Sequence, residues 1–195
     1  MVTVGDTAPD FAAPAVGGAP EGDAERTATE LALFRLVEAH DAVALCLAPA
    51  TFVPPCTAAL AAVRDAGWHD RDGLAVVALT GDSLYAAFAY ADRFGLPFPV
   101  VADFHGGVAE SYDLLADSWE GHSGILRRAT VVIDGDWTVR FAEATDDPLD
   151  RADPAPVRRA AETLREIGID VDRPRVNYDG PWWARRGRAR RRRGP

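Results

Sequence analysis

The apolar positions of this chain fall into short continuous runs, separated by longer stretches in which apolar residues recur with helical spacing. The runs at 43–48 and 74–80 are almost wholly apolar, and 98–103 is a third, short run. A strand that is covered on both faces has this composition, whereas a half-exposed strand alternates between apolar and polar residues. The pattern therefore predicts three central strands.

Helices are predicted between and after these strands. One helix runs from Cys56 to near Gly67, and two more span 84–95 and 107–115. A last helix, which Asp153 caps and Pro154 begins, ends the fold. Asp82 and Ser83 precede the second helix as N-cap residues, and Gly95 ends it. Proline in the first turn is compatible with a helix because the amide that it lacks has no partner there.

Two further strands are predicted at 129–134 and 137–144, joined as a hairpin around Gly135 and Asp136. With these strands, the order is that of an α/β domain with a mixed central sheet and helices on both faces. The Gly-rich stretch at 16–27 is either a loop or a further hairpin. We expect one domain over 1–172, followed by an unstructured Arg-rich tail over 173–195.

Composition narrows the class of protein. No apolar stretch is long enough to cross a bilayer and no signal pattern precedes the first strand, so we expect a cytoplasmic protein without membrane contact.

The net charge is −9, yet the last fifteen residues carry seven arginines and no acidic residue. Such a tail, which includes Trp182 and Trp183, could contact nucleic acid. Because the acidic body repels a polyanion, we favour a tail that is solvated or folds back on that body.

Two cysteines are too few for a disulfide scaffold, and Cys46 and Cys56 do not form a CxxC motif. Four scattered histidines form no metal-ligand cluster, so neither a metal nor another cofactor is expected. His122, in the loop before the 129–134 strand, is a weaker candidate for a site residue. The chemistry to be explained is therefore that of single thiols.

Cys56 directly follows Pro54 and Pro55 at the point where a helix begins. Free backbone N–H groups and the helix dipole favour an anion there, but the dipole lowers a thiol pKa by less than about one unit. A nearby cation is needed to make a good nucleophile, and Arg128 is the candidate if its strand lies beside the Cys56 turn. The alternative is that Cys56 is simply a small buried apolar residue.

Four segments resemble the peroxiredoxins, the alkyl hydroperoxide reductase/thiol-specific antioxidant family with a thioredoxin-like fold. They are "VGDTAPDFAAPAV", "APATFVPPCTAAL", "FGLPFPVVADFHGGVAESYDLL" and "RRATVVIDGDWTVRFAEATDDP", in the family's order and spacing over about residues 2–170. The resemblance implies that Cys56 is the peroxidatic cysteine, which attacks a hydroperoxide and becomes a sulfenic acid. It also implies that Pro49 shields this cysteine and that Arg128 lowers its pKa, whereas Arg127 is expected in a surface ion pair.

One position departs from the family pattern. Where the family has Thr or Ser, three residues before the cysteine, this chain has Val53, which keeps the shape of threonine but lacks its hydroxyl. Such a hydrogen bond to a charged partner contributes about 1.5–3 kcal/mol. Thr51 could reach into the substrate pocket in its place, and Pro55 is expected to stiffen the turn.

A second, resolving cysteine is missing at the chain's end, and Cys46 is expected to be part of the core, although a Cys46–Cys56 disulfide stays open at this stage. The resemblance then implies a one-cysteine peroxidase that reduces hydrogen peroxide or alkyl hydroperoxides and depends on thioredoxin or a small thiol. A homodimer would suit the family. The alternative is a degenerate redoxin that binds a partner or senses oxidant, and a CxxC-type oxidoreductase is disfavoured.

Overall fold

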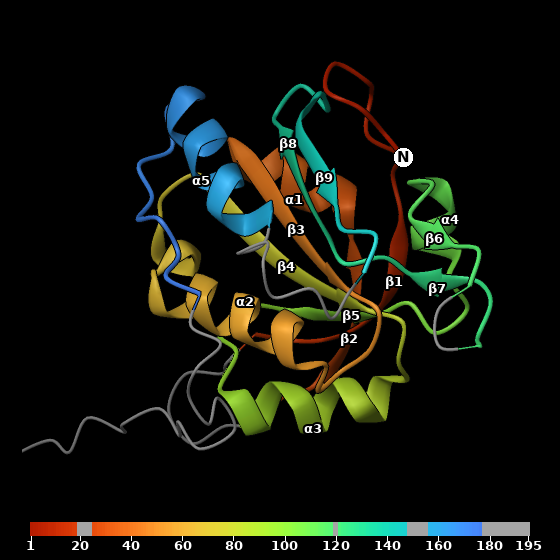
Figure 1. The fold of residues 1–195 in the computed structure, drawn as a ribbon. Helices are drawn as coiled ribbons and strands as arrows, with labels where there is room; N and C mark the ends of the chain where they lie inside the picture. Colours follow the sequence, from red (N-terminus) through yellow and green to blue (C-terminus); the bar gives the residue numbers. More distant parts are fainter. Residues whose placement is uncertain (19–24, 119–120, 148–155, 177–195) are drawn as a thin grey trace, which may run out of the picture.

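A seven-stranded sheet forms the centre of the computed structural model, which describes residues 1–18, 25–118, 121–147 and 156–176. The strands lie in the order β2-β1-β5-β4-β3-β8-β9 (Figure 1). Their bounds are Ala12–Val16 (β1), Ala28–Ala32 (β2), Ala42–Ala48 (β3), Leu74–Thr80 (β4), Val100–Ala102 (β5), Ala129–Asp134 (β8) and Val139–Ala144 (β9). A separate short pair joins β6 (Leu115–Ala116) to β7 (Ile125–Leu126). β3, β4 and β5 run parallel, and the other neighbours in the large sheet pair antiparallel.

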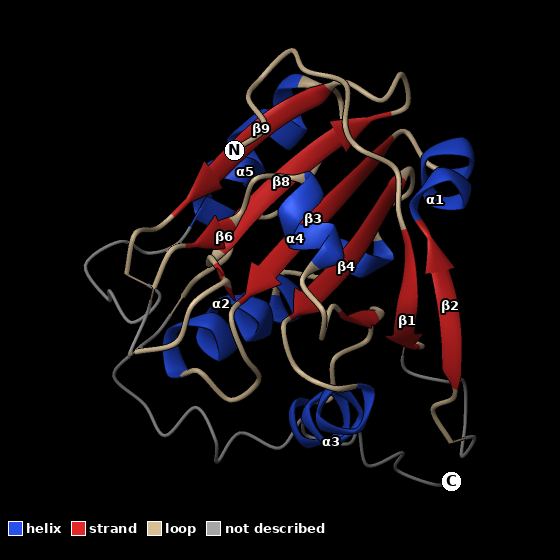
Figure 2. Cartoon of the chain, turned by 90° about the vertical axis from the view of Figure 1, so that its right-hand side faces the viewer, coloured by secondary structure: helices blue, strands red, loops and turns tan. Residues whose placement is uncertain are grey.

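Helices cover both faces of this sheet, as Figures 1 and 2 show. They are α1 (Leu33–Ala39), α2 (Pro54–Asp65), α3 (Leu84–Phe94), α4 (Gly107–Ser111) and α5 (Pro156–Glu166), with a 3₁₀ turn at Trp68–Asp70. α2, α3 and α5 supply the apolar cluster on one face, and α1 and α4 supply the cluster on the other. The predicted α/β class, with a mixed sheet between helices, is confirmed.

Strand β3 shows why the central runs are continuously apolar. Ala42, Ala44 and Cys46 belong to the core on the α2 side, while Val43, Leu45 and Leu47 belong to the core on the α1 side. All seven residues of β3 are buried, because the strand has a neighbour on each edge and a helical layer on each face.

The N-terminal region is more regular than the sequence pattern indicated. The stretch at 16–27, predicted as a loop or a hairpin, connects the antiparallel strands β1 and β2, although residues 19–24 lie outside the described part. Helix α1 was not predicted, because it has only seven residues and its N-cap position, Ala32, makes no side-chain capping bond.

Helix α3 has the predicted caps and a further anchor at its end. The Ser83 hydroxyl accepts a hydrogen bond from the Ala86 amide, and Gly95 ends the helix with a φ of +57°. Arg26 pairs with Asp92 at 2.8 Å and donates to the Leu96 carbonyl oxygen at 2.6 Å. The N-terminal hairpin and the C-terminal end of α3 are therefore held together.

The C-terminal segment stays on the domain as far as the structure describes it. Trp68 is fully buried, and its indole N–H donates to the Asp172 carbonyl oxygen at 2.8 Å. Val176 still packs against the core. Residues 148–155, with the expected caps Asp153 and Pro154, and residues 177–195 lie outside the described part, so the division at residue 172 stays a prediction. Within the described chain, no helix is both long and apolar enough to cross a membrane.

Candidate active site

Cys56 lies in the first turn of α2, at the end of the loop that leaves β3. Pro54 and Pro55 occupy the first helical positions, and the Thr57 amide donates to the Val53 carbonyl oxygen at 2.9 Å. The thiol belongs to a small apolar cluster with Ala48 and Val53 and is only 1% exposed. Among the described residues, Cys46 and Cys56 are both free thiols.

The loop before the thiol is fastened to the loop that follows β4. The Thr51 amide and hydroxyl both donate to one carboxylate oxygen of Asp82, at 2.7 and 2.6 Å. Gly81 passes so close that a Cβ there would lie 2.8 Å from the Pro49 carbonyl oxygen, which explains why this position lacks a side chain. Pro49 itself is buried. Thr51 therefore anchors the loop, and its hydroxyl proton is already used by Asp82.

Arg128 precedes β8 and is almost completely buried, with 2% of its surface exposed. Its Nε donates to the Thr145 hydroxyl at 3.2 Å, and the Thr145 amide donates back to the Arg128 carbonyl oxygen at 2.9 Å. Nη1 and Nη2 are buried without a hydrogen-bond partner in the described part of the chain. Buried polar groups are nearly always paired, so these two nitrogens are candidates to bind a further acceptor.

A cavity of about 10 Å³ brings these groups together. Cys56, Arg128 and Cys46 all line it, with apolar residues of α2, β8 and α5. That volume is at the lower limit for one water molecule. Cys56 and Arg128 therefore lie at one cavity, whereas Pro49, Thr51 and Val53 do not line it.

The direction of the pKa of Cys56 differs from the expectation. Burial raises the pKa of Cys56 to about 12, and the Arg128 charge and a backbone hydrogen bond lower it only in part. Both lowering influences predicted from the sequence are present, but loss of water outweighs them. Burial likewise raises the pKa of Cys46 to about 12, in keeping with a core position.

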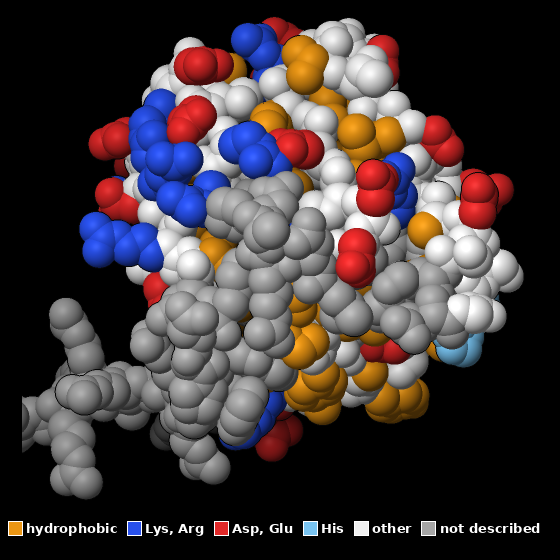
Figure 3. Space-filling view, viewed as in Figure 1, with side chains coloured by type: hydrophobic (Ala, Val, Ile, Leu, Met, Phe, Trp, Pro, Cys, Tyr) orange, Lys and Arg blue, Asp and Glu red, His pale blue; other side chains and the backbone are white. Residues whose placement is uncertain are grey.

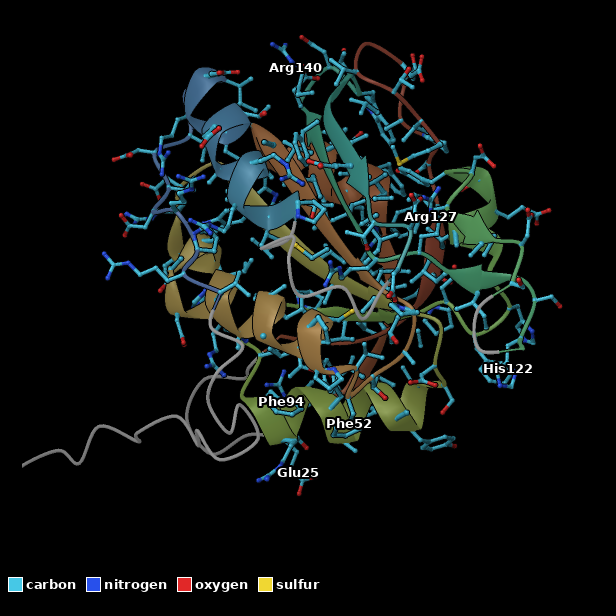
Figure 4. All side chains as sticks on the ribbon, in the orientation of Figure 1. Glu25, Phe52, Phe94, His122, Arg127 and Arg140 are labelled. Carbon is cyan, nitrogen blue, oxygen red and sulfur yellow. The ribbon has the colours of Figure 1, made fainter. Side chains whose placement is uncertain are left out.

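Two other candidates lie away from this centre. Arg127 pairs with the exposed Asp146, as expected of a surface ion pair. His122 is exposed and projects from the outer edge of the molecule (Figure 4). Among the described residues, no three His, Cys, Asp or Glu side chains come together as metal ligands.

Sequence reasoning missed three partners of the site. Asp82 was predicted as a helix cap but holds Thr51, Thr145 holds Arg128, and Tyr90 donates to Thr57 beside the thiol. No local motif marks these contacts, because each joins residues that are 17 to 33 positions apart.

Comparison with known proteins places this geometry in a family. The model of the AhpC/TSA family matches residues 4–142. No curated protein matches the chain. Among solved structures, the peroxidoxin BcpB of Mycobacterium tuberculosis is 25% identical, with 86% of this chain and 99% of that chain covered and a TM-score of 0.67.

Two more distant structures show the same fold. AhpC of Mycobacterium tuberculosis is 22% identical over 86% of this chain and 93% of that chain, with a TM-score of 0.66. The reduced 2-Cys peroxiredoxin of Plasmodium vivax is 23% identical over 84% and 93%, with a TM-score of 0.65. Because the family model matches most of its length, the chain belongs to the AhpC/TSA family, and it has the thioredoxin-like fold of the peroxiredoxins.

Proposed function

We propose that this protein is a one-cysteine thiol peroxidase that reduces hydrogen peroxide or alkyl hydroperoxides at Cys56. Family membership supports a thiol-dependent peroxidase. The observation that carries the assignment to these residues is the shared cavity, in which the two unpaired nitrogens of Arg128 lie beside the only thiol at a helix N-terminus in the described chain.

In the proposed reaction, the Cys56 thiolate attacks one peroxide oxygen, the O–O bond breaks, and the second oxygen leaves as hydroxide or alkoxide and takes up a proton. Arg128 stabilises the charge on sulfur and on the departing oxygen. The product is a sulfenic acid. An external thiol then condenses with it, releasing water, and a second thiol reduces the mixed disulfide and restores Cys56.

The buried arrangement sets a condition on this chemistry. Because burial raises the pKa of Cys56 to about 12, the neutral thiol dominates near neutral pH. The cavity is also too small for a peroxide. Formation of the thiolate therefore depends on the Arg128 charge, which lowers the pKa of Cys56 against the effect of burial.

The same two features, together with Val53, favour the second candidate, a degenerate redoxin that binds a partner or senses oxidant. Such a protein would oxidise once at Cys56 and turn over poorly. The distinction therefore lies in recycling of the sulfenic acid by a thiol donor.

The test is stopped-flow oxidation by hydrogen peroxide with intact-mass detection, on the native chain and the variants Cys46→Ala and Cys56→Ser. We expect one added oxygen in the native chain and in Cys46→Ala, at a rate well above that of a free thiol, and none in Cys56→Ser. Sustained peroxide consumption with thioredoxin or a small thiol would support the peroxidase. Oxidation no faster than that of a free thiol would refute it, and a single oxidation without turnover would favour the sensor.

Restoring a hydroxyl at position 53 should accelerate the reaction. Val53 is buried against Cys56, so a threonine there would place a donor beside the sulfur without changing the shape of the side chain. We expect Val53→Thr to raise the second-order rate of Cys56 oxidation roughly 10- to 150-fold. Val53→Ala is the matched control, since it loosens packing without adding a hydroxyl. An equal acceleration in both variants would show that access, rather than the missing hydrogen bond, limits the rate.

Removing the buried guanidinium should separate activity from stability. We expect Arg128→Met to slow Cys56 oxidation roughly 10²-fold, because a charge-stabilising donor is lost. Since Arg128 lowers the pKa of Cys56, its loss should also shift the rate–pH curve to higher pH. The free energy of unfolding should stay equal or rise, because two unpaired buried nitrogens disappear. Arg127→Met removes only a surface ion pair and should change neither the oxidation rate of Cys56 nor the free energy of unfolding. Equal losses of rate in both variants would contradict the role assigned to Arg128.

We also propose that the protein forms a homodimer and acts in the cytoplasm. Tyr85 and Phe104 are 85% and 64% exposed at a largely apolar groove of about 570 Å³ between α3, β1 and α4, and such exposed patches often mark interfaces. Sedimentation velocity should give a dimer that Tyr85→Ser weakens, and a monomer at high concentration would contradict it.

Two free thiols suit a reducing compartment, so recovery of the native protein outside the cell would contradict the location.

A further inference from the structure

A second cavity lies at the C-terminal end of α2, at the other end of the helix from the thiol. This cleft has a volume of about 660 Å³ and opens between α2, the first turn of α5 and the segment that follows α5. Three arginines line it, Arg158, Arg173 and Arg175. Ala62 and Ala66 supply an apolar part of its wall. Pockets that bind small molecules have volumes of about this size.

The acidic residues of the cleft already have partners. Asp172 pairs with Arg71 at 3.1 Å, and Asp65 pairs with Arg64 at 2.8 Å. Neither of these arginines belongs to the described lining of the cleft. The two carboxylates are therefore balanced from outside, and they leave the three lining arginines available.

The lining arginines are only weakly engaged within the described chain. Arg158 Nε is buried and makes no hydrogen bond there, and Arg175 forms no ion pair with a described residue. Arg173 pairs with Glu162 at 3.3 Å, but both side chains are about half exposed, so this pair contributes little. Figure 3 shows arginine side chains gathered over α5 and the segment that follows it. The cleft thus presents positive charge on a chain whose net charge is −9.

The segment at 171–175, which forms one wall of the cleft, is held in place. The Trp68 indole N–H donates to the Asp172 carbonyl oxygen at 2.8 Å, and Arg165 Nε donates to the Val171 carbonyl oxygen at 2.9 Å. The Val171 side chain is buried in the core. A wall that is fixed beforehand loses little conformational entropy when a ligand binds.

The charge and shape of these side chains favour one class of ligand. A guanidinium group is a planar fork of donors that matches the oxygens of an anion. A phosphate group carries up to two negative charges and several oxygens, so it can accept from more than one arginine at once. The dipole of α5 favours an anion near Arg158 in the first turn, and the C-terminal end of α2 opposes it. The arginines, rather than the helix ends, therefore supply the attraction.

We infer that this cleft binds a small molecule that carries a phosphate group. Arg158, Arg173 and Arg175 hold the phosphate, and the rest of the molecule lies against Ala62 and Ala66. The site uses none of the groups assigned to peroxide reduction, so either proposal can fail without the other.

The experiment titrates the full chain with inorganic pyrophosphate and with ADP by isothermal titration calorimetry. An ionic strength of about 0.15 M screens weak attraction to exposed charges. We expect saturable binding of both probes, and tighter binding of ADP because its apolar part also contacts the α2 wall. Arg158→Gln and Arg175→Gln should each weaken ADP binding about tenfold, since each removes a charged donor. Arg175 is exposed, so its replacement leaves the core intact.

Arg35→Gln is the matched control. It removes the same charge from an exposed position of α1, the helix on the other face of the sheet, and should bind both probes like the native chain. The seven arginines of the last fifteen residues are present in every variant, so any attraction of the probes to them is the same throughout.

The inference would be overturned if neither probe bound saturably to the native chain, or if Arg35→Gln weakened binding as much as Arg158→Gln. Citrate, which offers carboxylates in place of phosphates, serves as the competing anion. Binding of citrate as tight as that of pyrophosphate would show that the cleft does not prefer phosphate and would also overturn the inference.

Discussion

Exclusion of water from the space between α2 and β3 is the condition on which the whole site depends. A thiol and a guanidinium share one cavity there, burial raises the pKa of Cys56 to about 12, and two nitrogens of Arg128 have no partner among the residues that the structure describes. The same dry surroundings make the interaction between these groups strong once a thiolate forms, because little water screens it. Stability of the resting form and reactivity of the thiol thus oppose each other at one place.

The topology explains why these groups meet. β3 and β4 run parallel, so the loops that leave their carboxyl ends lie side by side, and Thr51 of one loop reaches Asp82 of the other. β8 runs antiparallel to β3, which brings the start of β8, next to Arg128, beside the end of β3. Three segments that are far apart in sequence therefore converge on the first turn of α2, a position where the helix already favours negative charge.

Much of the fold could be predicted because its central strands are buried on both faces. The run at 74–80 coincides with β4 and the run at 43–48 falls within β3, since continuous burial leaves an unmistakable apolar pattern. The N-terminal hairpin left a weaker pattern: β1 reads Ala-Ala-Pro-Ala-Val, with few large residues, and its register comes from pairing with β2 and β5. Local sequence cannot determine such pairing.

At the site, the sequence indicated which groups would meet but not how dry their surroundings would be. Cys56 and Arg128 were predicted together, whereas the direction of the pKa depends on burial by α2, β8 and α5, a tertiary property. Thr51 was expected near substrate, yet its hydroxyl is held by Asp82. Tyr90 carries no motif at all, because its partner Thr57 lies 33 residues earlier.

Helix α3 is fixed at both ends, by Ser83 at the start and by Arg26 at the finish. Because both of its ends are anchored, α3 has little freedom to move relative to the site (Figure 3 shows apolar side chains along this edge). Tyr90 of this helix donates to Thr57 beside the thiol, so the anchors of α3 also fix one contact of the first turn of α2. A change in the distant N-terminal hairpin that removes the Arg26 contacts would therefore be felt at the thiol through α3.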